Sequence, residues 1–424
     1  MQATEPLMTV NREKPNKWTV MVYMAGDNNL DNLGIADLRE MKRVGSTDQV
    51  QVIAELDRAN EFVTKRYWLK NHSVRPRLQD DVVEELDESN SGSPEQLTKF
   101  IRWGMYNFEA EHYLVIIWGH GAGAYDEDIY YSDRNRLGRA TRRRGMFRPS
   151  IAPPLGEVTG LLDSNKLLLE MRLIAPDDQA RDFIDNVELK NALQAVGRKI
   201  EILGMDACLM SMIEVCYQLQ HLVDITVSSE AQEPLEGWPY EAFLRLLTDS
   251  PEMKPPRVAK LIVEEFVKLY EDYENSSTTL AACDLTKCDV IKAGLADLSD
   301  ALLANLHENE VFDAIMLVRY LVQSNEAIET VDLYDLCELL KLKCKNAAIL
   351  GSCERLIEAF RDSRMVIKTQ PLKDDAKYWH GLGVYFPSSE VSAQYGRLDI
   401  VQPGITRWKE FIDKYVSTDG RTHV

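Results

Sequence analysis

The sequence contains no long hydrophobic run. No window of eighteen consecutive apolar residues occurs in its 424 residues, so we expect neither a membrane-spanning helix nor a membrane partner. The first eighteen residues, MQATEPLMTVNREKPNKW, lack an apolar stretch of signal-peptide length, and we therefore expect a cytoplasmic protein. The apolar and charged fractions, 45% and 28%, are typical of a soluble globular protein.

Paired cysteine motifs are also missing. The seven cysteines are an odd number, and no two of them form a CxxC pair. Neither a structural zinc site nor a disulfide framework is therefore expected, and free thiols in a reducing compartment fit better. They are Cys208, Cys216, Cys283, Cys288, Cys337, Cys344 and Cys353.

Basic residues are outnumbered by acidic ones, 49 to 68. The formal net charge is -19, and because phosphate binding requires a basic surface, no nucleic-acid partner is expected. One segment departs from this trend: RNRLGRATRRRGMFR (Arg134 to Arg148) contains seven arginines in fifteen residues and no acidic residue. By itself, such a run is equally well explained as a solvated loop.

Apolar runs alternate with helical patterns over the first 250 residues. The runs are VMVYMAG, VQVIAELD, YLVIIW, KIEILGM and VDITVSSE. Nearly continuous apolar strands separated by helices predict an α/β fold with a mostly parallel sheet covered by helices. Beyond the segment DSPEMKPP (Asp249 to Pro256) helical patterns dominate, and we expect a helix-rich region over 251–424 that contributes two further strands, TTLAACDL and GLGVYFP.

A long irregular segment interrupts the region 1–250. From about 125 to 182 the chain is rich in Arg, Pro and Asp and has weak periodicity, and it includes the arginine run. An insertion of this length inside a compact domain usually has a function.

A histidine and a cysteine follow two of the predicted strands. His120 lies two residues after YLVIIW, and Cys208 lies three residues after IEILGM. Because the carboxyl ends of parallel strands open on one edge of a sheet, both side chains are expected there, although they are 88 residues apart. An imidazole can take the proton of a thiol, and a helix predicted from Leu209 to Leu219 would favour the thiolate. The Gly121 amide could donate to an oxyanion.

Both residues also fit structural roles. A cysteine after a strand is more often a core residue, and a histidine in a glycine-rich loop is more often structural. GHGAGA resembles a phosphate-binding loop, but it lacks the GKS/T ending and the GxGxxG spacing.

Asp206 lies two residues before Cys208. Its negative charge would disfavour a thiolate, so we expect it to face away from the sulfur, toward a cationic group of a substrate. A partly desolvated carboxylate selects Arg or Lys strongly, because a neutral side chain would leave it unpaired.

Three motifs together resemble the clostripain family of cysteine peptidases. They are WGHGAGA, GMDACLMSM and SSEAQEPLEGWPY, supported by the opening VMVYMAGDNNLD and the late HGLGVYFP. The resemblance extends from about residue 18 to residue 388. It implies a caspase-like three-layer sandwich, the fold shared with gingipains, legumains and caspases, with residues 1–250 as the peptidase domain.

The resemblance also implies a function. His120 and Cys208 match the family's catalytic dyad, and Asp206 matches the acid of the pocket that binds a basic P1 side chain. Glu230 and Trp238 are further candidates for that pocket. The expected partners are polypeptides cleaved after Arg or Lys, and the alternative is a caspase-fold scaffold that binds partners without catalysis.

Two further family properties concern the insertion and metal ions. Many members mature by cutting themselves between the histidine and cysteine segments, and here that interval contains Arg139, Arg142, Arg143 and Arg144. Some members respond to calcium. No cofactor or metal site is expected here, because DRNRLG has too few carboxylates for a calcium loop.

Overall fold

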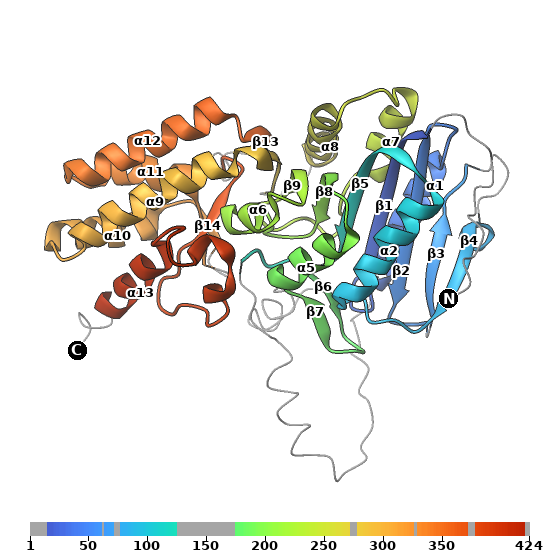
Figure 1. Cartoon of the computed structure of the whole chain (residues 1–424), viewed down its shortest axis with the longest axis horizontal. Coiled ribbons are helices and arrows are strands. Elements are labelled where there is room, and N and C mark those ends of the chain that lie inside the picture. The colour runs from blue at the N-terminus through green and yellow to red at the C-terminus, as the bar shows by residue number, and fades with distance from the viewer. Residues whose placement is uncertain are drawn as a thin grey trace, which may run out of the picture.

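A nine-stranded sheet forms the centre of the molecule (Figure 1). The structure, a computed structural model, describes residues 15–61, 63–71, 77–124, 174–271, 278–325, 329–371 and 378–419. In spatial order the strands are β13 (Val366–Pro371), β10 (Thr279–Asp284), β9 (Val223–Ser228), β8 (Ile200–Asp206), β5 (Ala110–Trp118), β1 (Asn16–Gly26), β2 (Val50–Arg58), β3 (Val63–Trp68) and β4 (Val82–Asp87). The five strands from β9 to β2 run parallel, as predicted. The strands on both sides of them are antiparallel.

The central strands are buried on both faces. Along β1, Met21, Tyr23 and Ala25 belong to one hydrophobic core, and the intervening Val22 and Met24 belong to the other. This explains why the strand sequences are almost continuously apolar rather than alternating.

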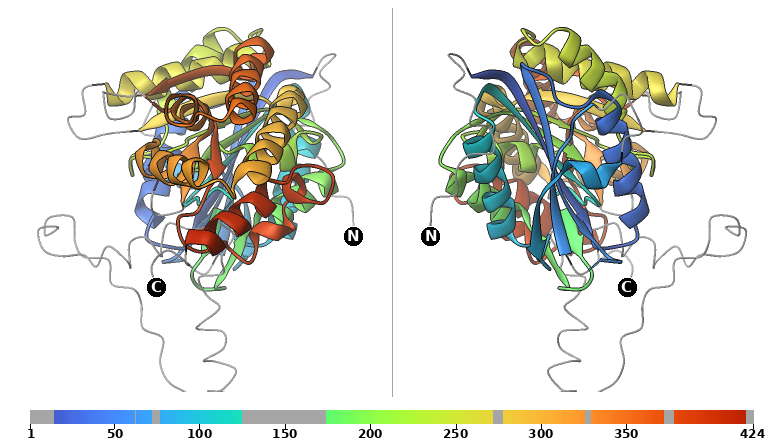
Figure 2. Two further views of the ribbon diagram at one scale, coloured as in Figure 1. Left: turned by 90° about the vertical axis from the view of Figure 1, so that its left-hand side faces the viewer. Right: turned by 90° about the vertical axis from the view of Figure 1, so that its right-hand side faces the viewer.

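Helices cover each face, which gives the three layers (Figures 1 and 2). One face is packed by α1 (Asp31–Val44), α7 (Tyr240–Asp249) and α8 (Pro255–Tyr270). The other is packed by α2 (Pro94–Asn107), α5 (Asn186–Val196) and α6 (Ile213–Leu219). The predicted α/β sandwich is therefore confirmed.

The region after residue 250 is helix-rich and shares the sheet, since it provides β10 and β13. Its helices gather beyond the β13 side of the sheet in Figure 1 and continue one of the two cores. They are α9 (Cys288–Asn305), α10 (Asn309–Leu321), α11 (Leu333–Lys343), α12 (Ala347–Ser363) and α13 (Trp408–Asp419). A small sheet of β11 (Ser324–Asn325), β12 (Thr330–Asp332) and β14 (Gly383–Tyr385) lies among them.

The end of the predicted insertion is a hairpin of β6 (Ile174–Asp177) and β7 (Asp182–Ile184). Residues 125–173 lie outside the described part of the chain. Within the described part, none of the helices is both long and apolar enough to cross a bilayer.

The order of the strands creates a switch point at the carboxyl edge of the sheet. The chain leaves β1 toward β2 on one side, whereas from β5 it continues to β8 and β9 on the other. The loops after β1 and β5 therefore diverge, and this is where open α/β sheets form ligand sites.

Candidate active site

The histidine and cysteine segments meet at the carboxyl edge, as predicted. β5 and β8 are neighbours, and Trp118 is paired with Asp206. His120 and Cys208 each lie two residues beyond this pair, so both leave the sheet at the same level. The Gly119 amide donates to the Asp206 carbonyl at 3.2 Å, which continues the strand pairing into the two loops.

Gly121 allows the two loops to touch. A Cβ atom at this position would lie 2.4 Å from the Cys208 carbonyl oxygen and 3.1 Å from the Cys208 nitrogen. Real Cβ atoms do not approach backbone so closely, so only glycine lets the histidine loop pack on the cysteine backbone.

The helix predicted from Leu209 begins later. α6 starts at Ile213, and Leu209 has a φ of 68°, a left-handed conformation that cannot belong to a helix. Tertiary hydrogen bonds keep this stretch out of a helix, because the amides of Leu209 and Ser211 donate to the carbonyls of Ala231 and Ser229. The expected stabilisation of a Cys208 thiolate by a helix N-terminus was therefore wrong.

Cys208 is covered by the segment that follows β9. Its side chain is 8% exposed, and the Glu233 amide donates to Sγ at 3.2 Å. Burial, and then the charges of Glu233 and Asp206, raise the pKa of the thiol to about 12. In this conformation the sulfur is a neutral thiol.

His120 is held by a residue from the β1–α1 loop. Its ring is 8% exposed, and Nε2 lies 2.7 Å from Oδ1 of Asn29. Because an amide oxygen only accepts, Nε2 carries the proton and Nδ1 is left with a lone pair. Burial lowers the pKa of the imidazole to about 4, which keeps the ring neutral and able to accept a proton.

A second carboxyl group, not predicted from the sequence, lies beside Asp206. Asp206 is 6% exposed and accepts a 2.7 Å hydrogen bond from the Tyr240 hydroxyl. The Glu233 carboxyl lies within hydrogen-bond reach of Asp206, and Trp238 Nε1 donates to it at 3.1 Å. Burial raises the pKa of Asp206 to about 6, against the opposing hydrogen bonds, and burial raises the pKa of Glu233 well above its usual range. The two carboxyl groups therefore share protons in the absence of a cation.

Of the two other pocket candidates, one lies at this site. Trp238 is fully buried, its ring meets Gly204 on the sheet, and its backbone hydrogen bonds to Asp206. Glu230 instead accepts a hydrogen bond from the Gly381 amide and faces Asp332. Its carboxyl group fastens the segment before β14, so we now interpret it as a structural residue.

The loop GHGAGA is not built to bind phosphate. Its amides at Gly123 and Ala124 donate to the sulfurs of Met210 and Met212, at 3.3 and 3.1 Å. With the Gly119 amide bonded to Asp206, these donors are not free for an anion. The phosphate-binding alternative for this loop is therefore not supported.

Comparison with known proteins identifies the relatives of this arrangement. A family model described as the clostripain family matches residues 22–136 and 159–396. Clostripain of Hathewaya histolytica is 28% identical over 229 residues, which are 49% of this chain and 37% of that protein. The match thus spans little more than a third of the length of this curated relative.

Solved structures show the same fold. A secreted C11 cysteine protease from Bacteroides thetaiotaomicron, "iotapain", superposes with a TM-score of 0.64 at 15% identity, covering 94% of this chain and 99% of that one. An inactive zymogen C11 protease from Parabacteroides distasonis gives a TM-score of 0.62 at 18% identity, with the same coverage. These likenesses confirm the fold that the resemblance implied.

Proposed function

The chain belongs to the clostripain family, and from that premise we propose that it is a cysteine endopeptidase that cleaves after arginine or lysine. One observation carries the proposal: His120 and Cys208 stand two residues beyond the paired Trp118 and Asp206, with Gly121 pressed against the Cys208 backbone. Two segments that are distant in sequence thereby offer a thiol and a base at one edge.

The hydrogen bond to Asn29 determines which ring nitrogen of His120 can accept a proton. With Nε2–H donating to Asn29, Nδ1 of His120 accepts the proton of the Cys208 thiol as sulfur attacks the substrate carbonyl. The His120 imidazolium then protonates the leaving amine, the C–N bond breaks, and a thioester remains on Cys208. Water then attacks the thioester carbonyl and gives a proton to His120. The C–S bond breaks, the carboxylic acid product leaves, and His120 returns the proton to the sulfur, which restores the thiol. Asn29 is thus a positioning residue, which acts through His120.

The oxyanion of each step requires donors beside the sulfur. The backbones of Gly121 and Cys208 lie in contact at this point. We assign their two amides as the oxyanion donors, because such preorganised N–H groups stabilise charge that develops in the transition state.

Asp206 and Glu233 together form the P1 site in this proposal. A guanidinium or ammonium group entering between them replaces the shared protons, which gives each carboxylate a charged partner. Because the Glu233 backbone also covers Cys208, it must shift away from the sulfur before a substrate carbonyl can reach it, while the Glu233 carboxyl keeps its place beside Asp206. Binding of the correct P1 side chain is thereby coupled to exposure of the nucleophile.

Hydrolysis of amide reporters with varied P1 residues tests the function. We expect cleavage with P1 Arg or Lys and, for a neutral residue of similar length such as Gln or Met, kcat/KM lower by at least about 10³-fold. If no reporter is cleaved by folded protein under reducing conditions, the binding scaffold becomes the better description.

We further propose that the chain matures by cutting itself in the arginine run. The candidates Arg139, Arg142, Arg143 and Arg144 lie outside the described residues, between the segments that carry His120 and Cys208. β5 and β8 flank this interval and pair along their length, so the fragments stay associated after cleavage.

Mass spectrometry of denatured protein tests self-cleavage. Wild type is expected to give two fragments, the second beginning after one of these arginines, whereas Cys208→Ala and a fourfold arginine-to-alanine variant remain whole. A single wild-type chain with full activity would show that processing is not required.

A further inference from the structure

Exposed apolar side chains are concentrated on two helices of the region after residue 250. Ten large apolar side chains are exposed in the described part of the chain, and four of them lie on α10 and α11. They are Leu317, Tyr320, Leu321 and Leu342, of which Tyr320 is 85% and Leu342 is 71% exposed. A single exposed apolar residue needs no explanation, but a group of them typically marks a surface that binds another molecule.

A groove lies between the start of α10 and the end of α11, and Val311, Ala314 and Leu317 line it on the α10 side. The two helices pack against each other beyond the β13 side of the sheet (Figures 1 and 2). Because Leu317, Tyr320 and Leu321 are spaced by three and four residues, they share one face of α10. The apolar lining of the groove therefore continues along the helix into the exposed side chains.

The two sides of the groove carry opposite charges. Glu310 and Asp313 line it on the α10 side, and we call them the acidic pair. Lys343 and Lys345 line it at the end of α11, and we call them the lysine pair. All four side chains are exposed, and none has an ion-pair partner within 4.0 Å among the residues that the structure describes.

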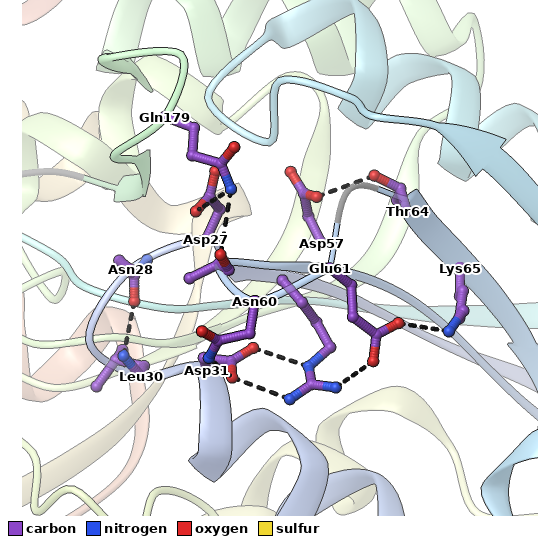
Figure 3. A network of polar contacts seen from close by, with 12 residues as sticks. Asp27, Asn28, Leu30, Asp31, Asp57, Asn60, Glu61, Thr64, Lys65 and Gln179 are labelled. Atoms are coloured by element: carbon purple, nitrogen blue, oxygen red, sulfur yellow. Dashed lines mark hydrogen bonds and ion pairs between the residues drawn. The ribbon is translucent and has the colours of Figure 1, made fainter. Parts of the chain in front are cut away.

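Other charged groups of this protein are paired within the chain. Asp31 and Glu61, drawn in Figure 3, share the guanidinium of Arg58. On α11 itself, Lys341 lies 3.9 Å from Glu338. The acidic pair and the lysine pair are thus available to a partner, and they flank an apolar groove as polar residues flank the centre of a protein interface.

We propose that this groove is a two-fold interface between two copies of the chain. A two-fold axis that runs along the groove places α10 of one copy on α11 of the other. The acidic pair of each copy then faces the lysine pair of its partner, and the contact occurs twice, as in any interface with this symmetry. Leu317 lies close to the axis, and the facing helices cover Tyr320 and Leu342.

The charges favour a second copy over other occupants. The net charge of -19 makes two chains repel each other, so that association requires a surface with local attraction. A uniformly acidic or basic partner would match only one side of the groove. The arginine run of this chain would meet the lysine pair with like charge. A second copy carries both signs in the required arrangement.

The proposed interface is independent of the proposed function. α10 and α11 lie beyond β13, whereas His120 and Cys208 follow β5 and β8 in the middle of the sheet (Figure 1). A dimer formed through the groove therefore leaves both candidate active sites open to substrate.

Analytical ultracentrifugation of the full-length Cys208→Ala chain under reducing conditions tests the interface without self-cleavage or disulfides between chains. We expect the mass to rise with concentration from one chain to two, with a Kd in the micromolar range, because a groove of this kind gives a contact at the small end of protein interfaces. A mass of one chain at every concentration up to about 100 µM, or growth beyond two chains, would overturn the proposal.

Tyr320→Glu in the same background should raise the dimer Kd by at least about tenfold, because it places a charge in the apolar part of the interface. Tyr106→Glu is the matched control, since Tyr106 is a tyrosine that is 60% exposed on α2, outside the groove. We expect it to leave the Kd unchanged. An equal effect of the two substitutions, or no effect of Tyr320→Glu, would contradict the assignment.

Exchange of the charges tests the two-fold arrangement. One variant carries Glu310→Lys with Asp313→Lys, and the other carries Lys343→Glu with Lys345→Glu. Each variant alone brings like charges together on both sides of the axis and should dimerise at least about tenfold more weakly than its parent.

A mixture of these two variants should form a heterodimer, because every contact again joins opposite charges. Native mass spectrometry measures it when one variant carries a mass tag. Misfolding of either variant would not be repaired by mixing, so recovery of the dimer distinguishes the interface from a structural defect. A mixture that associates no more tightly than its components would contradict the proposal. If either variant does not fold, the mass of the parent and the effect of Tyr320→Glu still decide the question.

Discussion

Cys208→Ala is expected to lower kcat for an arginine-ended amide reporter by at least about 10⁴-fold, because the sulfur forms the bond on which every later step depends. The imidazole and the oxyanion donors would remain, but without a nucleophile they give only slow background hydrolysis. Turnover is measured under reducing conditions, with circular dichroism to establish that the variant is folded.

Cys216→Ala is the matched control for this experiment. Cys216 is also a buried cysteine and lies in α6, where its sulfur contacts Thr226 on the sheet. We expect this variant to retain turnover within a few-fold. Undiminished activity in Cys208→Ala, or an equal loss in both variants, would remove the nucleophile assignment.

Asp206→Asn should lower kcat/KM for arginine and lysine reporters by about 10²–10³-fold, since a buried charge pair loses about 2–5 kcal/mol when one partner is removed. Reporters with a neutral P1 residue should lose far less. The decisive quantity is the ratio of kcat/KM for Arg and Gln reporters, because a general structural defect would lower both values together.

The stability of Asp206→Asn separates specificity from folding. Burial raises the pKa of Asp206 in the folded protein to about 6. The folded state therefore disfavours the ionised carboxylate, and Asp206 lowers the free energy of unfolding as the pH rises above the usual pKa of an aspartate. An isosteric neutral amide should therefore not lower the melting temperature at pH 7. Glu233→Gln should reduce the Arg-to-Gln ratio to a smaller extent, because Asp206 remains. An unchanged ratio in Asp206→Asn would contradict the P1 assignment.

The features predicted correctly from the sequence are those encoded within one segment. The apolar runs ending at Trp118 and Met205 predicted neighbouring parallel strands, and strands arranged in this way bring His120 and Cys208 to one edge of the sheet. The strands predicted at TTLAACDL and GLGVYFP also form, as β10 and β14. Their placement, β10 in the large sheet and β14 in a small second sheet, was not predicted, because it depends on pairing with distant segments.

The features that were missed depend on contacts between distant segments. The stretch after Cys208 has helical composition, yet hydrogen bonds to residues 229–231 keep it out of a helix, so that α6 begins only at Ile213. Glu233 lies beside Asp206 only because its segment folds back over Cys208. The carboxylates of Asp27, Asp57 and Asp177 also lie close together, although these residues are 30 and 120 positions apart, a spacing that no local motif records.

The Glu233 segment covers Cys208, and this explains how a thiol can lie beside the carboxyl groups of Asp206 and Glu233 at one edge of the sheet. With Glu233 in place, the sulfur is a buried thiol and Asp206 shares a proton, so the resting site has little charge. In our proposal, a basic P1 side chain supplies the counter-charge and moves the Glu233 backbone off the sulfur. We therefore expect that binding of a basic P1 side chain and exposure of the Cys208 sulfur occur together.

The central claim is that the sulfur at position 208 and the ring at position 120 act together on a substrate with a basic P1 residue. Labelling with an arginine-ended, thiol-reactive peptide probe, followed by peptide mapping, tests it most directly. We predict a single adduct on Cys208, none on the other six cysteines, and loss of the adduct in His120→Ala. An adduct on another cysteine, or equal labelling of Cys208 with and without His120, would contradict it.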